Sequence, residues 1–295
     1  MRIAVTGKQG QIVQSLLALA PAHGVEVIAV GRPELDLADP ASVQPALATA
    51  RPDVIVSAAA YTAVDKAESE AELAHAVNAL GAGAVAEAAA GLGVPVIHLS
   101  TDYVFSGDKH SPYIETDPTG PISVYGSTKL EGELRVAAGH ANHVILRTAW
   151  IYSPFGANFV KTMLRLAESR DEVRVVADQH GCPTSALDIA DAVFAIAKRL
   201  SENSSPALRG TFHLTGSGVA TWAQFAQEIF ARSKALGGRA AHVVPISTAE
   251  YPTPARRPAN SRLSGDKLAE TYGIRLPDWK RSTDVVMQAI LKNAI

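Results

Sequence analysis

The chain has 295 residues, of which 47% are hydrophobic and 19% charged, so it can bury the core of a large α/β domain with a smaller companion. Its formal net charge of −2 gives no global positive field to hold a polyanion, and nucleic acid is not an expected partner. Its apolar stretches are broken by Glu, Asp or Gly and stay short of the roughly 20 residues that span a bilayer, so no membrane association is expected.

Cysteine usage and the first residues point to a reducing compartment. Cys182 is the single cysteine and has no partner for an intramolecular disulfide. The chain starts with a strand-like run at 3–6 rather than with a basic stretch and an apolar signal segment. We therefore expect a cytoplasmic protein.

The first half of the chain alternates between two kinds of segment. Short β-branched runs are separated by Ala/Leu/Glu-rich, helix-like stretches of roughly 10–15 residues. The runs lie at 3–6, 25–30, 53–57, 94–100 and 144–150. This alternation predicts an α/β fold with a doubly wound, parallel, Rossmann-like sheet.

After residue 150 the spacing becomes less regular and predicts a smaller C-terminal lobe. We expect a dinucleotide-binding domain over 1–152, joined by part of 173–215, and an interleaved substrate-binding lobe over 153–295. The expected elements are helices at 158–168, 185–200, 222–235 and 281–292, strands at 173–177 and 211–216, and a surface loop at 201–210.

The stretch TGKQGQIVQSL at 6–16 joins the first strand to the first helix. Gly7 and Gly10 stand where a tight turn lets backbone N–H groups approach a pyrophosphate at a helix N-terminus. Val13 occupies the place of the usual third glycine. On this stretch alone, the alternative interpretation is an ordinary glycine-containing turn between a strand and a helix that binds no phosphate. Arg32, directly after the second strand, suits a 2′-phosphate and favours NADPH over NADH.

A second group of residues could carry proton chemistry. Tyr125 and Lys129 are four residues apart in a predicted helix, so both side chains lie on one face. A nearby ammonium lowers the pKa of a phenol, which predicts a tyrosine that exchanges its proton near neutral pH. Thr101 and Asp102 close the fourth strand, where open parallel sheets bind ligands. An incidental Tyr/Lys pair on an amphipathic helix is the alternative.

Several motifs together resemble the extended short-chain dehydrogenase/reductase superfamily and, within it, the dTDP-4-dehydrorhamnose reductase family. They run through nearly the whole chain. They are TGKQGQI, AAYTAVDKAE, STDYVFSG, VYGSTKLEGE, LRTAWIYS, FVKTMLRLA, DQHGCPT and YPTPARRPANSRL. The resemblance implies reduction of the C4 ketone of dTDP-4-dehydro-L-rhamnose to dTDP-L-rhamnose by NADPH, or by NADH.

The resemblance also implies roles for particular residues. Tyr125 would donate the proton, Lys129 would hold the nicotinamide ribose and lower the pKa of Tyr125, and Thr101 would bond the sugar oxygen. The expected cofactor-binding residues are Gly7, Gly10, Gln11, Ile12, Arg32, Asp36, Leu37, Ala60, Tyr61, Thr62, Tyr125 and Lys129. The expected substrate-binding residues are Thr101, Asp102, Trp150, Asn158, Arg256 and Arg257, with Arg262 as a weaker candidate. Asn78 resembles an asparagine that holds water near the site.

No metal is expected, because the helix after the glycine turn reads Gln14-Ser15 where some family members have a magnesium-binding glutamate. Nor do the 9 histidines show HExxH or Cys/His spacing. A dTDP-sugar is the expected partner, and a homodimer is left open. Two alternatives stay open: another nucleotide-sugar reductase or epimerase, and a non-catalytic NADP-binding regulator like the regulatory subunit of methionine adenosyltransferase.

Overall fold

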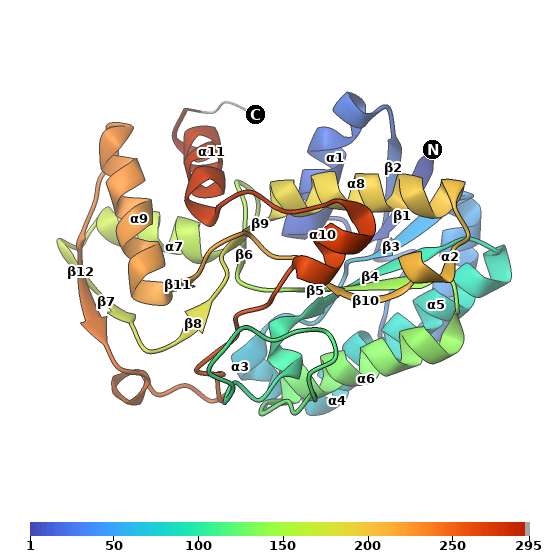
Figure 1. Ribbon diagram of the computed structural model, residues 1–295, viewed down its shortest axis with the longest axis horizontal. Helices are drawn as coiled ribbons and strands as arrows, with labels where there is room; N and C mark the ends of the chain where they lie inside the picture. The colour runs from blue at the N-terminus through green and yellow to red at the C-terminus, as the bar shows by residue number, and fades with distance from the viewer. Residues whose placement is uncertain (293–295) are drawn as a thin grey trace.

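A six-stranded parallel sheet forms the larger lobe (Figure 1). From one edge to the other its strands are β10 (Gly210–His213), β5 (His143–Thr148), β4 (Val96–Thr101), β3 (Val54–Ser57), β1 (Arg2–Thr6) and β2 (Glu26–Val30). The computed structural model describes residues 1–292. The predicted parallel, doubly wound, Rossmann-like sheet is confirmed.

Helices cover both faces of this sheet (Figure 1). They are α1 (Gln11–His23) and α8 (Ala186–Glu202) on one face, and α2 (Val43–Ala50), α5 (Gly81–Leu92) and α6 (Val124–Gly139) on the other. Along β1, Ile3 and Val5 pack into the first helix layer and Ala4 into the second, all with no exposed surface. Because successive strand side chains point to opposite faces, burial on both sides explains why the strands are apolar without alternation.

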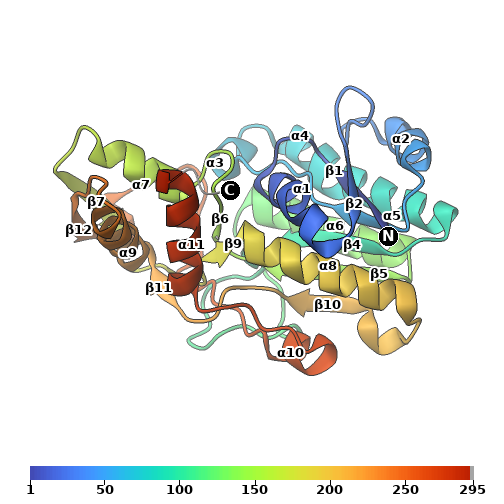
Figure 2. The same cartoon turned by 90° about the horizontal axis from the view of Figure 1, so that it is seen from above.

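The smaller lobe has its own apolar core. Its helices are α7 (Phe159–Ala167), α9 (Trp222–Ala235) and α11 (Trp279–Lys292), and its strand pairs are β6 (Ile151–Tyr152) with β9 (Thr184–Ser185), β7 (Glu172–Val176) with β12 (His242–Ile246), and β8 (His180–Gly181) with β11 (Ala220–Thr221). Figure 2 shows these helices and β7/β12 gathered at one end of the molecule, toward which β10 points. A capping box, in which Thr221 and Gln224 bond each other's backbone N–H, fixes the start of α9.

The strand order sets the position of the ligand crevice. The chain leaves β1 to form β2 on one side and later returns to form β3 on the other side. In open parallel sheets ligands bind outside the carboxyl ends of strands at such a switch point. The short helices α3 (Val64–Ala67) and α4 (Ala71–His75) follow β3, and a π-helical segment, Ala76–Leu80, leads into α5.

Some elements differ from the sequence prediction. Helix α8 extends to Glu202, into the predicted loop; its last two residues, Ser201 and Glu202, are exposed and so need not be apolar. Strand β12 and helix α10 (Asp266–Tyr272) were not predicted from the sequence.

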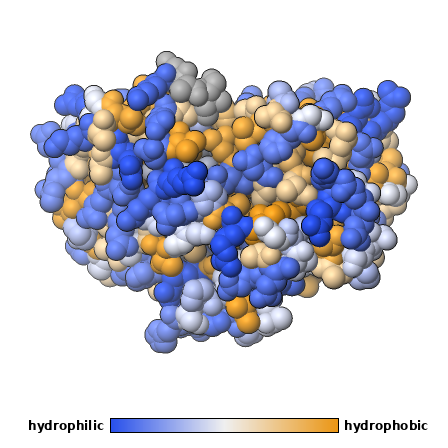
Figure 3. Space-filling model, turned by 45° about the horizontal axis from the view of Figure 1, so that its top comes forward, coloured by the Kyte–Doolittle hydropathy of each residue, from blue (hydrophilic) through white to orange (hydrophobic). Residues whose placement is uncertain are grey.

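Polar side chains cover much of the face in Figure 3, with apolar ones in small groups among them. Within residues 1–292 no helix is both long and apolar enough to cross a membrane.

Candidate active site

The glycine turn after β1 has the backbone geometry of a phosphate cradle. Gly7 has a φ of +95°, which strongly favours glycine, and its N–H donates to the carbonyl of Val30 at 2.7 Å. A methyl group on Gly31 would lie 3.2 Å from the Gly7 Cα, so the two turns approach closely. Gly10 precedes α1 and provides no side-chain cap, which leaves first-turn N–H groups available to an anion.

Val13 replaces the usual third glycine without closing the turn. It is 2% exposed and belongs to the core between α1 and the sheet. A methyl group on Gly7 would lie 3.6 Å from Val13 Cγ2, which is ordinary van der Waals contact. Val13 therefore packs beneath the turn, and the phosphate-facing backbone keeps its conformation.

A cleft of about 580 Å³ opens from this turn along the ends of β1, β2 and β3. It brings together many of the predicted cofactor residues, namely Gly7, Arg32, Asp36, Leu37, Ala60 and Tyr61. It also contains residues outside the predicted cofactor-binding set: Lys8, Gln9, Gly31, Leu35, Ala38, Ala59, Leu73 and Val77. The glycine-lined backbone and the polar lining fit a dinucleotide.

Lys8 is a second cation in this cleft beside Arg32. Its Nζ donates to the Arg32 carbonyl at 3.0 Å and to Glu34 Oε2 at 2.6 Å. This pairing holds the pKa of Glu34 below its usual value. The position of Lys8 inside the glycine turn was the available signal, since a cation there lies beside any bound phosphate.

Three further residues that were predicted to bind the cofactor, Gln11, Ile12 and Thr62, do not line the cleft. Ile12 is 8% exposed and packs in the core of the sheet lobe. Thr62 is exposed after β3. Gln11 uses its side-chain oxygen to accept hydrogen bonds from Ser153 Oγ at 2.9 Å and Asn158 Nδ2 at 3.1 Å. The Gln11 side chain thus connects the glycine turn to the small lobe.

Asn78, in the π-helical segment, is a structural cross-link. Its Oδ1 accepts from the Tyr61 N–H at 2.8 Å, and its Nδ2 donates to the Tyr61 carbonyl at 3.1 Å and to Thr128 Oγ1 at 3.2 Å. Gly132 lets α6 approach, because a methyl group there would lie 2.2 Å from the Asn78 carbonyl oxygen. The Asn78 side chain thus ties the segment after β3 to α6, and the water-holding role expected for Asn78 stays a prediction.

The end of β4 carries Thr101 and Asp102, both buried. Thr101 Oγ1 donates to Asp102 Oδ1 at 2.9 Å and accepts from the Tyr103 N–H at 3.2 Å. Burial raises the pKa of Asp102 to about 6, although the nearby hydroxyls of Ser261 and Thr101 oppose this rise. In this structure the single hydroxyl hydrogen of Thr101 is therefore directed to Asp102.

Tyr125 stands near Thr101 at the start of α6, edge-on to Tyr103 with 5.5 Å between ring centroids. The prediction of a lowered pKa was wrong for the protein without cofactor. Burial raises the pKa of Tyr125 to about 12, partly opposed by its hydrogen bond with Thr101 and reinforced by the negative charge of Asp102. The loss of hydration raises the pKa of Tyr125 more than its favourable neighbours lower it.

Lys129 points from α6 to β4 and is 2% exposed. Its Nζ donates to the Leu99 carbonyl at 2.7 Å and lies 3.4 Å from His98 Nε2. Burial lowers the pKa of Lys129 to about 8, and the negative charge of Glu133 partly opposes this shift. The sequence reasoning missed the buried ion pair of Glu133 with Arg147, whose closest atoms are 2.7 Å apart.

Trp150 turns the chain from the sheet lobe into the small lobe. Its φ is +48°, and its ring stacks on Trp222 with centroids 3.5 Å apart and 6° between the planes. A methyl group on Gly181 would lie 2.3 Å from Trp150 Cε2, so this glycine makes room for the ring. Asn158 caps α7 by accepting from the Lys161 N–H at 3.2 Å.

The arginine-rich segment 251–263 is fixed at several points. Arg257 Nη2 donates to Asp65 Oδ2 at 2.8 Å and Nη1 to Asp65 Oδ1 at 3.2 Å, so this ion pair engages the guanidinium expected to meet a diphosphate. Arg256 is exposed. Arg262 Nε donates to Asn260 Oδ1 at 2.7 Å.

Within residues 1–292 no group of three or more His, Cys, Asp or Glu side chains could hold a metal ion.

A glycine-turn cleft in a doubly wound sheet, with Thr101 at the end of β4 and Tyr125 and Lys129 on α6, defines an NAD(P)-binding protein of the extended short-chain dehydrogenase/reductase type. The profile described as RmlD substrate binding domain matches residues 1–292. The chain belongs to this dTDP-4-dehydrorhamnose reductase family, as the sequence analysis predicted.

Particular relatives cover nearly the whole chain. A dTDP-4-dehydrorhamnose reductase of Sinorhizobium fredii is 61% identical over 291 residues, which are 99% of this chain and 98% of the relative. The crystal structure of a dTDP-4-dehydrorhamnose reductase from Clostridium acetobutylicum has a TM-score of 0.90 and 39% identity, covering 98% of this chain and 99% of that one. The Bacillus anthracis dTDP-4-dehydrorhamnose reductase in complex with NADP has a TM-score of 0.89 and 35% identity, covering 97% and 98%.

Proposed function

We propose that this chain reduces the C4 ketone of dTDP-4-dehydro-L-rhamnose to dTDP-L-rhamnose with NADPH. The observation that carries the proposal is that Thr101 ends β4, Tyr125 lies near it at the start of α6, and Lys129 donates to the Leu99 carbonyl of β4, all on the edge of the sheet at which the glycine-turn cleft opens. Family membership supplies the sugar nucleotide, because the relatives named above are dTDP-4-dehydrorhamnose reductases.

Tyr125 is the proposed proton donor. A pKa of about 12 keeps the phenol protonated throughout the neutral range, which is the form that a reduction requires. The proton would pass from its Oη to the C4 oxygen as negative charge develops there. General acids of this kind contribute roughly 10²–10⁴-fold to a rate.

Lys129 is the proposed electrostatic partner of Tyr125. With a pKa of about 8 it is an ammonium at neutral pH, and the Leu99 carbonyl fixes the position of its Nζ. A buried positive charge close to the reacting oxygen stabilises negative charge more strongly than one in water. Lys129 would also hold the nicotinamide ribose.

The cleft residues would hold the cofactor. The α1 N-terminus would present N–H groups to the pyrophosphate, which the glycine backbone of the turn lets approach closely, and Lys8 and Arg32 would present positive charge to a 2′-phosphate. When bound there, the nicotinamide supplies the hydride for C4. The NADP complex of the Bacillus anthracis relative supports the choice of NADPH.

The substrate would lie between the lobes. Thr101 and Asp102 come from the sheet lobe, Trp150 from the junction and Asn158 from the small lobe. Exposed Arg256 is available to the diphosphate, whereas Arg257 would have to leave Asp65 first. A nucleotide-activated sugar and the unpaired thiol of Cys182 support a cytoplasmic location, and the homodimer stays a prediction.

The test is the loss of reduced-nicotinamide absorbance with NADPH, then with NADH, when dTDP-4-dehydrorhamnose is generated in situ. The sugar product is then identified by NMR. Consumption that yields dTDP-L-rhamnose supports the proposal. A product of different C4 configuration would indicate another nucleotide-sugar reductase, and cofactor binding without turnover would indicate a regulator.

A further inference from the structure

Only one of the two carboxylate oxygens of Asp102 has a hydrogen-bond partner. The residue is 2% exposed, and its Oδ2 is buried without a hydrogen-bond partner. Its Oδ1 accepts from Thr101 Oγ1 at 2.9 Å. A buried carboxylate with an unpartnered oxygen is costly, and protonation removes much of that cost.

The hydroxyl of Thr101 has one hydrogen and two lone pairs, so its contacts can be counted. One lone pair accepts from the Tyr103 N–H at 3.2 Å. The hydrogen goes to Asp102 while that residue is an anion, because a carboxylate can only accept. Thr101 then has no hydrogen left for a sugar oxygen.

Protonation of Asp102 reverses this bond. The neutral acid carries a hydrogen on Oδ1 and can donate it across the same 2.9 Å to Thr101 Oγ1. With both lone pairs of Thr101 occupied, by the Tyr103 N–H and by Asp102, its own hydrogen must point elsewhere. The phenol of Tyr125, the proposed proton donor, lies near this hydroxyl, which partly opposes the rise in the Tyr125 pKa.

We propose that Asp102 is a positioning residue whose protonation turns the Thr101 hydroxyl toward the substrate and so adds a second hydrogen-bond donor, beside Tyr125, at the C4 oxygen. This inference rests on the proposed reduction. Tyr125 still gives the transferred proton, and Asp102 changes only the direction of the Thr101 hydrogen. Two donors stabilise a developing oxyanion better than one.

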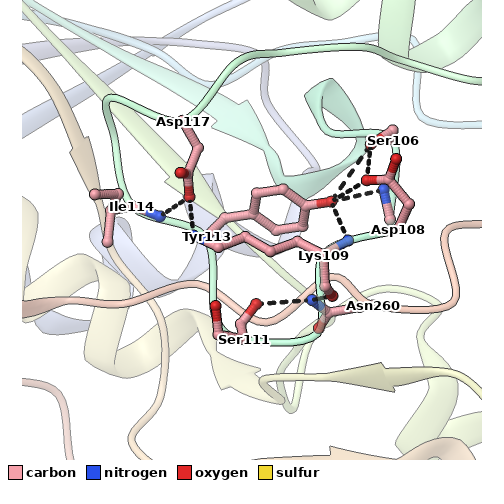
Figure 4. Close-up of polar contacts among 9 residues, drawn as sticks. Ser106, Asp108, Lys109, Ser111, Tyr113, Ile114, Asp117 and Asn260 are labelled. Carbon is pink, nitrogen blue, oxygen red and sulfur yellow. Dashed lines mark hydrogen bonds and ion pairs between the residues drawn. The ribbon is translucent and has the colours of Figure 1, made fainter.

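The surroundings of Asp102 hold it in this arrangement. The hydroxyl of Ser261, which donates to the His180 carbonyl at 3.4 Å, lies close enough to Asp102 to oppose the rise in its pKa. The titratable groups that sense the charge of Asp102 are Tyr103, Tyr125 and Cys182. The segment of Ser261 is anchored by its neighbour Asn260, whose Nδ2 donates to the Ser111 carbonyl at 3.0 Å and to the Lys109 carbonyl at 2.6 Å (Figure 4).

Figure 4 also shows how the loop that receives Asn260 is held. Tyr113 Oη accepts from the Lys109 N–H at 3.2 Å, and Lys109 forms an ion pair with Asp117. These contacts anchor the segment of Asn260 and Ser261 beside Asp102, whose Oδ2 is buried without a hydrogen-bond partner.

The first test is the pH dependence of turnover under saturating NADPH and sugar nucleotide. In the unsubstituted chain the rate should fall roughly 20-fold as the pH rises from 5 to 7.5, because the loss of one oxyanion donor lowers a rate by roughly 10²–10³-fold and a few per cent of Asp102 is still protonated at pH 7.5. Asp102→Asn cannot ionise, so its rate should stay constant over this range. Asp171→Asn, a change of an exposed carboxylate, is the matched control and should keep the fall. The proposal is overturned if Asp102→Asn keeps it too.

A second test does not depend on turnover. Infrared difference spectra of the protein without cofactor should contain the C=O band of a neutral buried carboxylic acid, lost as the pH rises through about 6. Thr101→Val should shift that band, because valine cannot accept from Asp102, and an unchanged band would overturn the coupling. This readout holds even if Asp102→Asn fails to fold. If no sugar is reduced at any pH but the band shifts, the proposed function fails while the Asp102–Thr101 coupling stands.

Discussion

Asn158 and Gln11 join the two lobes through their side-chain amides, with Asn158 Nδ2 donating to Gln11 Oε1 at 3.1 Å. Gln11 is the first residue of α1, directly after the glycine turn, and Asn158 caps α7 in the small lobe. One amide pair therefore couples the start of the cofactor cleft to the lobe proposed to hold the sugar nucleotide.

Asn158→Asp separates this coupling from helix capping. Aspartate still caps α7, but it cannot donate to Gln11, to Ser153 or to Phe155, whose carbonyls accept from Asn158 at 2.9 and 3.2 Å. We expect the free energy of unfolding to fall by about 1–3 kcal/mol, the usual cost of unsatisfied buried partners. Urea unfolding measures it. In a cycle with Gln11→Leu the two effects should be non-additive, and strict additivity would contradict a direct bond.

Tyr125→Phe removes the proposed proton donor and keeps the ring against Tyr103. Turnover should fall by roughly 10²–10⁴-fold, the range of general acid catalysis. The Kd of NADPH, measured by fluorescence titration, should change little. Near-normal turnover in this variant would remove Tyr125 from the mechanism.

Arg32→Ala tests whether Arg32 binds the 2′-phosphate of NADPH. Arg32 is exposed at the cleft, so its loss should leave folding intact and raise the Kd of NADPH much more than that of NADH. Isothermal titration with both cofactors measures the ratio. Equal weakening of both would show that Arg32 does not contact the phosphate, and Lys8→Ala would then identify the cation that does.

Arg147→Met breaks the buried ion pair with Glu133, whose side chains are 7% and 5% exposed. The carboxylate would be left with Ser100 as its remaining hydrogen-bond donor, and we expect a loss of about 3–5 kcal/mol in the free energy of unfolding. Adding Glu133→Gln should recover part of this loss, because no buried charge is left unpaired. A double variant less stable than Arg147→Met would refute this explanation.

Asp102 should make stability depend on pH. Its pKa is raised from 3.8 to about 6 in the folded protein, so the native state binds more protons than the unfolded state between these values. The contribution of Asp102 is fully present below about pH 4 and is lost as the pH rises through 6. Asp102→Asn should therefore gain stability relative to the unsubstituted chain with rising pH, reaching about 3 kcal/mol above pH 7. A difference that is constant from pH 4 to 8 would contradict the raised pKa.

The sequence by itself determined the features that depend on local geometry. Apolar runs between helical stretches gave the parallel sheet, and glycines after β1 gave the turn, because strand and helix periodicity act over a few residues. The four-residue spacing of Tyr125 and Lys129 put both on one face of α6, and STDYVF put Thr101 at a carboxyl strand end. Family membership followed from the same motifs.

Only the tertiary structure decided which partner each polar group meets and how strongly it is desolvated. Arg257 pairs with Asp65 across 192 positions, and Lys129 bonds the Leu99 carbonyl of β4. The lowered pKa expected for Tyr125 failed because burial acts against the phenolate more strongly than its neighbours act for it. How far a side chain is removed from water, and how close it lies to its charged partner, depend on segments that are distant in the sequence and pack together in the fold. No local pattern in the sequence encodes either quantity.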